Sequence, residues 1–169
     1  MFVLQTKRLR LRHMAPEDAA FILDLLNDPA FHRFIGDRGV RTVEAARDYI
    51  LTASGAAPAR PGLGFHVVER KADDCPVGIC GLAKRDFLDD VDIGYAFLPQ
   101  HGGQGYALEA AQGVLAHART LALNRLVATV HPENSASIRL LEKLGLRFER
   151  TIQVPDSERA LHLFAMELG

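Results

Sequence analysis

Residues 98–110 read LPQHGGQGYALEA, and this stretch decides how the chain folds around a ligand. Gly102, Gly103 and Gly105 come directly before an alanine-rich, helix-forming run. Glycine adopts backbone conformations that other residues avoid, and it lets a ligand approach the main chain closely. A helix that begins at such a loop points its unpaired N–H groups and the positive end of its dipole toward whatever lies there. The stretch therefore predicts a loop that holds a phosphate or pyrophosphate through backbone contacts.

Two better-known phosphate loops do not match these glycines. The nucleoside-triphosphate loop continues with Gly-Lys-Ser or Gly-Lys-Thr, which does not follow here. The dinucleotide fingerprint needs glycines at its first, third and sixth positions, a spacing that Gly102, Gly103 and Gly105 do not give. A short glycine cluster is a weak signal by itself, so an ordinary turn between a strand and a helix stays open as an alternative at this point.

The surrounding residues resemble a known cofactor loop. Residues 103–107 (GQGYA), with Leu-Pro before and Glu-Ala after, resemble the acetyl-CoA loop of the GNAT superfamily of N-acetyltransferases. The family pattern is Gln or Arg, two variable residues, Gly, one variable residue, then Gly or Ala, and it falls here on residues 102–107. Gly102 stands where the family has Gln or Arg. The contribution of that side chain is therefore absent, while a backbone cradle can remain.

Three further blocks carry the same resemblance over nearly the whole chain. Residues 6–12 (TKRLRLR) and 15–19 (APEDA) resemble the opening of the branch that includes ribosomal-protein N-terminal acetyltransferases of the RimJ/RimL type. Residues 132–137 (PENSAS) and 141–146 (LEKLGL) resemble the second cofactor-side helix of that branch, and 92–95 (DIGY) its acidic-Ile-Gly-Tyr strand. Four ordered blocks are much more specific than one glycine loop.

The resemblance implies a single acetyltransferase domain over residues 1–169. Its fold class would be α/β (α+β), with three layers: a mostly antiparallel mixed sheet, splayed at the acetyl-CoA site, and helices on both faces. Pantetheine would lie in that opening like an extra strand. The implied activity is acetyl transfer from acetyl-CoA to the α-amine of a peptide or protein. The alternatives are a small amine as acceptor (an amino acid, polyamine or antibiotic), a non-catalytic acyl-CoA-binding module and, more weakly, a nucleotide-binding protein.

The resemblance also implies roles for individual residues. Asp92 would act as the base, through a water because its side chain is short, and Ser137 would donate a proton to the leaving thiolate. Asn134 would contact the pantetheine arm. The remaining cofactor-binding residues would be Phe97, Leu98, Gly102, Gly103, Gln104, Gly105, Tyr106 and Ala107.

Each of these residues also has a purely structural interpretation. Asp92 can be a solvent-facing carboxylate at the end of a hairpin, since acidic residues are common in turns. Asn134 can cap a helix, with Ser137 in its first turn. Tyr95 and Tyr106 are further potential proton donors, but tyrosines beside a sheet are more often packed.

The pKa of the acceptor amine decides how strong a base the reaction needs. A peptide α-amine, with a reference pKa of about 7.7–8.0, costs roughly 0.5 kcal/mol to deprotonate near pH 7.4, whereas lysine, near 10.4, costs about 4 kcal/mol. An α-amine acceptor therefore requires only a weak base or a chain of waters.

Composition and charge narrow the classes of partner. The chain is 48% hydrophobic and 24% charged, as in ordinary globular domains, and its net charge of −1 gives no overall attraction for nucleic acid or membranes. The two cysteines, Cys75 and Cys80, and the histidines lack metal-ligand spacing. No apolar run suits a signal peptide or a membrane span. We therefore expect no metal, no nucleic-acid or membrane partner and a cytoplasmic location, and the family resemblance allows a monomer or a homodimer.

The hydrophobic periodicity predicts the order of the elements. Strands are predicted over residues 3–13, 65–70, 77–84, 91–98, 126–130, 147–153 and 160–168. Helices are predicted over residues 16–26 and 43–53, and from Asn134 to Gly145. A further helix is predicted to follow the glycine loop and to extend far enough to include Ala122 on its apolar face. Residues 54–64, rich in Ala, Pro and Gly, are expected to form a loop that could close over the site.

Overall fold

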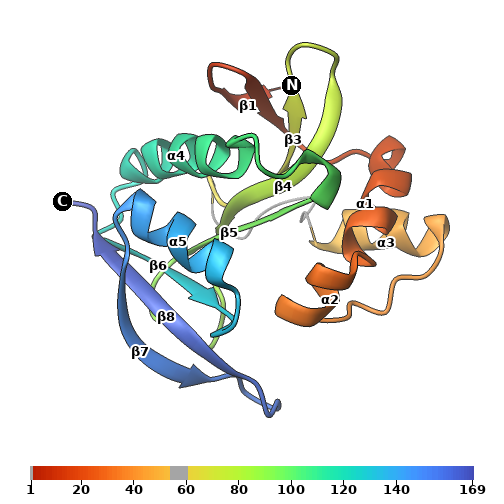
Figure 1. Ribbon diagram of the computed structural model, residues 1–169. Coiled ribbons are helices and arrows are strands. Elements are labelled where there is room, and N and C mark those ends of the chain that lie inside the picture. The colour runs from red at the N-terminus through yellow and green to blue at the C-terminus, as the bar shows by residue number, and fades with distance from the viewer. Residues whose placement is uncertain (1, 54–60) are drawn as a thin grey trace.

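An eight-stranded sheet forms the centre of the molecule (Figure 1). The computed structural model describes residues 2–53 and 61–169, and within them the strands lie in the order β1-β2-β3-β4-β5-β6-β8-β7. Every neighbouring pair is antiparallel except β5 and β6. The strands are β1 (Phe2–Gln5), β2 (Leu9–Arg12), β3 (Gly64–Arg70), β4 (Cys75–Ala83), β5 (Asp92–Phe97), β6 (Arg125–Val130), β7 (Arg147–Gln153) and β8 (Ala160–Glu167).

Helices cover both faces of this sheet. They are η1 (Pro16–Asp18), α1 (Ala19–Leu26), α2 (Pro29–Phe34), α3 (Val43–Ala53), η2 (Pro99–His101), α4 (Tyr106–Arg119) and α5 (Ser135–Leu144). Residues of α4 and α5 pack with Leu82 and Ile93 of the sheet in one core cluster, whereas residues of α1, α2 and α3 pack with Ile79 and Leu98 in another. Figure 1 shows the two helical groups on either side of β4 and β5. The predicted α/β class, with a mostly antiparallel sheet between helical layers, is confirmed.

The sheet opens between β5 and β6. These parallel strands share one register pair, Asp92 with Val127, and the Val127 N–H donates to the Val91 carbonyl at 3.0 Å. By contrast, β5 pairs with β4 over its whole length, and β6 pairs with β8 over its whole length. The carboxyl-terminal halves of β5 and β6 therefore diverge, which confirms the splay predicted at the strand before the glycine loop.

Two elements near the amino terminus differ from the prediction. Residues 3–13 were expected to form one strand, but they form the hairpin β1–β2, whose turn is closed by the Thr6 N–H donating to the Leu9 carbonyl at 2.9 Å. The helix expected over residues 16–26 does end at Leu26, but the sequence did not predict α2, whose first turn contains Pro29. Asp28 caps that helix, because its carboxylate accepts the N–H groups of Ala30 and Phe31.

The other elements agree with the prediction to within about two residues at each end. One detail is wrong: α4 ends at Arg119, so Ala122 lies beyond the helix, exposed and with a φ of 57°. Of the loop expected over residues 54–64, residues 54–60 lie outside the described residues, and Gly64 already begins β3.

Candidate functional site

The glycine loop forms an open backbone cradle at the amino end of α4. Gly103 has a φ of 74°, and Gly105, the N-cap of α4, has a φ of 80°, values that favour glycine. A Cβ atom added to Gly103 would meet nothing within 4 Å, and one added to Gly105 would meet only the Arg8 guanidinium at 3.4 Å. No side chain caps the helix, so its first N–H groups remain available to a ligand. Space, backbone geometry and helix polarity at this loop all fit a pyrophosphate.

Arg8, from the turn between β1 and β2, fastens the loop to the first turn of α4. Its Nη1 donates to the Gln104 carbonyl at 2.9 Å and its Nε to the Glu109 carboxylate at 2.7 Å. Its guanidinium carbon lies 4.6 Å from the centre of the Tyr106 ring. Thr6 Oγ1 and the Arg8 backbone N–H donate to the other Glu109 oxygen, at 2.5 and 2.8 Å. Sequence reasoning missed Arg8, because Arg8 and Glu109 are 101 positions apart and no local pattern links them.

This network sets the charge state of Glu109. Burial alone would raise the pKa of this carboxyl, but the hydrogen bonds from Thr6 and Arg8 outweigh it and lower the pKa below its ordinary value. Glu109 therefore stays ionised beside Arg8 at neutral pH.

The far side of the opening is formed by the first turn of α5. Asn134 caps this helix by accepting the Ser137 N–H at 3.2 Å, as its structural interpretation predicts. The Asn134 amide nitrogen donates no hydrogen bond within residues 2–53 and 61–169. It therefore remains free to donate to a ligand.

Ser137 is held by a tyrosine of the sheet. The Tyr95 and Ser137 hydroxyl oxygens are 2.6 Å apart, and Tyr95 also lies 3.3 Å from the Ser137 carbonyl. Burial raises the pKa of Tyr95 to about 12, so its hydroxyl keeps its proton at neutral pH. The two residues that the sequence named separately as potential proton donors thus form one pair.

Asp92 lies at the floor of the opening, where β5 and β6 meet. It is only 2% exposed, so the interpretation as a solvent-facing carboxylate is wrong. Arg85 Nε lies 3.2 Å from both of its oxygens. Burial raises the pKa of Asp92, and the Arg85 charge opposes that shift. Three neighbouring aspartates suggested a hydrated turn, and nothing in the sequence pointed to Arg85 as a buried partner.

Alternation along β5 places Asp92 and Tyr95 on opposite faces of the sheet. Ile93, Tyr95 and Phe97 pack against the cluster under α4 and α5, whereas Ala96 and Leu98 pack against the cluster under α1 and α3. The structure therefore brings together the loop, Phe97, Tyr95, Ser137 and Asn134 on one face. Asp92 approaches the opening from the other.

Helix α2 is tied to the loop before α5. Arg33 forms an ion pair with Glu133 at 2.8 Å, and Phe34 packs edge-on against His131, with ring centres 5.4 Å apart. The Arg159 guanidinium donates to the Phe34 carbonyl at 2.8 Å. These contacts join α2 to both the end of β6 and the β7–β8 turn, and Phe31 of α2 packs in the same cluster as Ala96 and Leu98.

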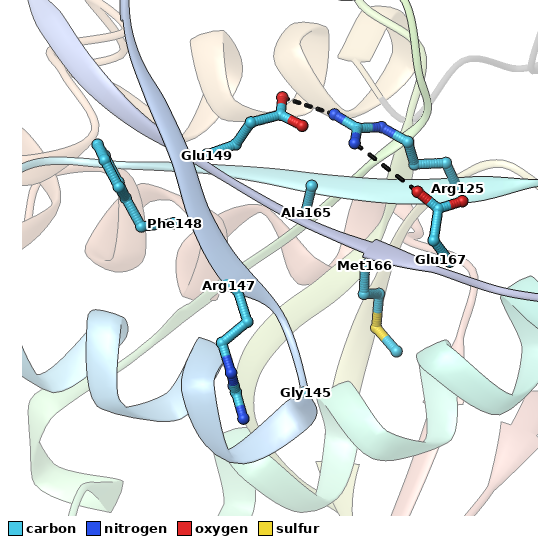
Figure 2. A pocket seen from close by; sticks show the side chains of 8 residues that line it. All are labelled: Arg125, Gly145, Arg147, Phe148, Glu149, Ala165, Met166 and Glu167. Atoms are coloured by element: carbon cyan, nitrogen blue, oxygen red, sulfur yellow. Dashed lines mark hydrogen bonds and ion pairs between the residues drawn. The ribbon is translucent and has the colours of Figure 1, made fainter.

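A pocket of about 410 Å³ lies elsewhere, along β7 and β8 (Figure 2). Figure 2 shows Arg125 between Glu149 and Glu167. It forms an ion pair with each, and the N–O distances are 2.6 and 3.9 Å. The lining residues include none of the predicted site residues. Within residues 2–53 and 61–169, no group of three or more His, Cys, Asp or Glu residues is arranged so that it could hold a metal ion. No helix in the same described ranges is long and apolar enough to cross a membrane.

Comparisons with known proteins identify the family. The model of the acetyltransferase (GNAT) domain matches residues 8–147. An uncharacterized N-acetyltransferase of Bacillus licheniformis, p20, is 33% identical over 95% of this chain and 89% of its own length. The crystal structure of a GNAT-family acetyltransferase from Bacillus anthracis has a TM-score of 0.81 at 26% identity, covering 99% of both chains.

A structure of Mycobacterium smegmatis RimJ in complex with a CoA disulfide is also similar. It has a TM-score of 0.76 at 26% identity, and the match covers 94% of this chain and 81% of that one. Members of this family use acetyl-CoA as the acetyl donor. With its glycine loop, its splayed sheet and these relatives, the chain belongs to the GNAT acetyltransferase family and is an N-acetyltransferase.

Proposed function

We propose that this chain acetylates the α-amine of a peptide or protein, with acetyl-CoA bound in the opening between β5 and β6. The observation that carries the proposal is the placement of this opening between the glycine cradle and the Ser137–Tyr95 pair. A long cofactor laid along the opening would meet an anion site at one end and a proton donor at the other. The similar structure of Mycobacterium smegmatis RimJ was solved in complex with a CoA disulfide, which supports CoA as the class of ligand.

Several residues would hold the cofactor. The backbone of Gly103 to Ala107 would bind the pyrophosphate, since the cradle is open and the first N–H groups of α4 point into it. The free amide nitrogen of Asn134 would donate to the pantetheine arm. Phe97 and Leu98, where β5 leads into η2, would line the strand edge along which that arm runs.

Acetyl-CoA supplies a thioester whose carbonyl carbon accepts the amine. In the reaction an N–C bond forms and the C–S bond breaks, the amine loses one proton, and the thiolate sulfur gains one. Ser137 would donate that proton. Tyr95 keeps its own proton, and either hydroxyl can be the donor across this contact. With the Tyr95 proton donated to Ser137 Oγ, the Ser137 O–H would be free to turn toward the sulfur.

The acceptor class follows from the nature of the base. Asp92 has a raised pKa, which makes it a stronger base than an ordinary aspartate, but it is 2% exposed and bound to Arg85. It would take the amine proton only through a water that reaches the floor of the opening. Such a base suits an amine with a pKa of about 7.7–8.0 better than a lysine or polyamine near 10.4. An α-amine is therefore the favoured acceptor.

Thermal unfolding with and without acetyl-CoA tests the cofactor. At about 100 times the Kd, binding should add about 2.7 kcal/mol and raise the midpoint by roughly 5–10 °C. A comparable rise with ATP or NAD, or none at millimolar acetyl-CoA, would contradict the proposal.

The acceptor is then tested by following free thiol release. The panel pairs peptides of one composition that differ only in a free or blocked amino terminus, with lysine present in both, and adds spermidine and free amino acids. Turnover confined to the free amino terminus supports the α-amine assignment. Faster turnover of spermidine or amino acids would instead identify a small-amine acetyltransferase. Binding of acetyl-CoA without turnover of any acceptor would identify an acyl-CoA-binding module.

A further inference from the structure

The glycine loop lacks a side-chain cation of its own. Gly102 occupies the position at which the family pattern has Gln or Arg, and residues 103–107 contain no basic residue. The first turn of α4 instead carries Glu109, a negative charge at the end of the helix that would receive the pyrophosphate. A pyrophosphate bound there would meet backbone N–H groups and an unfavourable carboxylate, unless a cation from elsewhere in the fold offsets it.

Arg8 supplies that cation from the turn between β1 and β2. Its Nε is engaged by Glu109 and its Nη1 by the Gln104 carbonyl. Within residues 2–53 and 61–169, its Nη2 has no hydrogen-bond partner. That nitrogen lies 3.4 Å from the point where a Cβ atom on Gly105 would stand. The side chain is 42% exposed, so its free N–H groups reach solvent at the mouth of the cradle.

The neighbouring contacts hold the guanidinium in this position. Glu109 accepts from Nε, Gln104 accepts from Nη1, and the Tyr106 ring lies under the guanidinium plane at 4.6 Å. A guanidinium fixed at two nitrogens loses little further conformational entropy when the third binds a ligand. Charge-assisted hydrogen bonds to phosphate are among the stronger protein contacts.

We propose that Arg8 binds a phosphate of the CoA pyrophosphate through Nη2, in place of the side chain that Gly102 lacks. The inference rests on the proposed cofactor site and adds to it a residue 94 positions before the loop's first glycine in the chain (Arg8 against Gly102). Arg8 thereby has two roles in the cofactor site. It holds the loop through the Gln104 carbonyl, and it contacts the CoA pyrophosphate that the loop binds.

The test measures the Kd of CoA by titration calorimetry for four proteins: wild type, Arg8→Gln, Arg8→Lys and Arg47→Gln. Arg47 is an exposed residue of α3, outside the site, and it controls for loss of one positive charge. We expect Arg8→Gln to weaken CoA binding about tenfold or more, Arg8→Lys to be intermediate because it keeps the charge but not the planar fork, and Arg47→Gln to match wild type.

Salt dependence separates a phosphate contact from a structural one. If Arg8 meets a phosphate, log Kd rises with ionic strength more steeply in wild type and Arg8→Lys than in Arg8→Gln. If Arg8 only holds the loop, Arg8→Gln weakens binding but keeps the wild-type slope, and the inference is overturned. It is equally overturned if Arg8→Gln binds CoA within twofold of wild type.

S-acetyl-pantetheine, which has no phosphate, provides a second comparison. Its binding should be unaffected by Arg8→Gln, whereas an equal loss for CoA and S-acetyl-pantetheine would mean a general disturbance of the site and contradict the inference. Failure of the proposed cofactor site looks different, because then wild type itself would not bind CoA. Failure of the proposed acetyl transfer alone would leave CoA binding, and its dependence on Arg8, in place.

Discussion

The hydroxyl of Tyr95 lies 2.6 Å from the hydroxyl of Ser137, although 42 positions separate the two residues. This contact joins β5, which leads into the glycine loop, to the first turn of α5, which Asn134 caps. The two walls of the opening are thus linked at the point where the proposed reaction takes place. Substitutions of Ser137, Tyr95 and Gly105 test which of these residues serves catalysis and which serves cofactor binding.

Replacing Ser137 with Ala should lower kcat about 10- to 100-fold and change the KM for acetyl-CoA by less than about threefold, because a proton donor acts in the transition state rather than in binding. Steady-state kinetics with a saturating peptide acceptor measure both constants. Ser135→Ala, two residues earlier on the exposed surface of α5, is the matched control and should match wild type. Full activity in Ser137→Ala would mean that Ser137 has no catalytic role and serves only in the capped first turn of α5.

Replacing Tyr95 with Phe removes the hydrogen bond to Ser137 and keeps the ring. We expect kcat to fall about three- to tenfold and the free energy of unfolding by about 1 kcal/mol, the usual worth of one hydrogen bond. If Tyr95 acts only by orienting Ser137, the double variant with Ser137→Ala should be no slower than Ser137→Ala alone. Multiplied losses in the double variant would show that Tyr95 acts independently.

Replacing Gly105 with Val should abolish acetyl-CoA binding, because a β-branched side chain would fill the cradle. The φ of 80° also makes the variant less stable by about 1–2 kcal/mol. Gly39→Val is the matched control, since Gly39 has a φ of 72° and open space around its Cβ position. Both variants should melt below wild type, but only Gly39→Val should keep the rise in midpoint with acetyl-CoA. An undiminished rise in Gly105→Val would refute the cradle.

Those parts of the site that depend on neighbours in sequence could be predicted. The start of α4 directly after the glycines follows from the helix-forming run that succeeds them, and the cap formed by Asn134 follows from its place before residues 135–144. The same local logic failed where one signal has two meanings. The turn over residues 6–8 lacks Gly and Pro and leads directly into the alternation of Leu and Arg, so β1 and β2 looked like one strand. Pro29 was interpreted only as the end of the preceding helix, although proline also suits the first turn of a helix, and α2 was therefore missed.

The contacts that hold the site together could not be predicted from local pattern. Arg8 with Glu109 spans 101 positions, and Tyr95 with Ser137 spans 42. Such pairs form only once the sheet has brought its strands beside α4 and α5. The charge state of Asp92 depends in the same way on burial, which a run of aspartates does not reveal.

Arg85 should stabilise the protein chiefly above the ordinary pKa of an aspartate. Because burial raises the pKa of Asp92, the folded state binds more protons than the unfolded state above about pH 4, and stability is lost as the pH rises through the folded pKa. Arg85→Leu leaves the charge unpaired and raises that pKa further. We expect a loss of about 1–3 kcal/mol at pH 7–8 and little loss at pH 4, since the half-exposed Arg85 is partly screened by water.

Urea unfolding of Arg85→Leu between pH 4 and 8 measures this effect. The double variant with Asp92→Asn should lose the extra pH dependence, because the titrating group is gone. A pH-independent loss in Arg85→Leu that persists in the double variant would mean that Arg85 contributes only packing. In kinetics, Asp92→Asn should lower kcat most above the folded pKa of Asp92, where the wild-type carboxylate is ionised and can relay the amine proton, and an unaltered pH profile would exclude that role.

Glu109 should give the opposite pH dependence. Hydrogen bonds from Thr6 and Arg8 outweigh burial and lower its pKa in the folded state, so the unfolded state binds more protons near the ordinary pKa of 4.5. The stability that Glu109 contributes is therefore complete above about pH 5.5 and is lost as the pH falls through the folded pKa. Glu109→Gln should be about 1–2 kcal/mol less stable than wild type at pH 7, with the gap narrowing below pH 4.5. Glu142→Gln, on the exposed face of α5, is the control and should be as stable as wild type at each pH. A loss of stability in Glu109→Gln that is constant from pH 3.5 to 7 would mean that the hydrogen bonds of Glu109 do not depend on its charge.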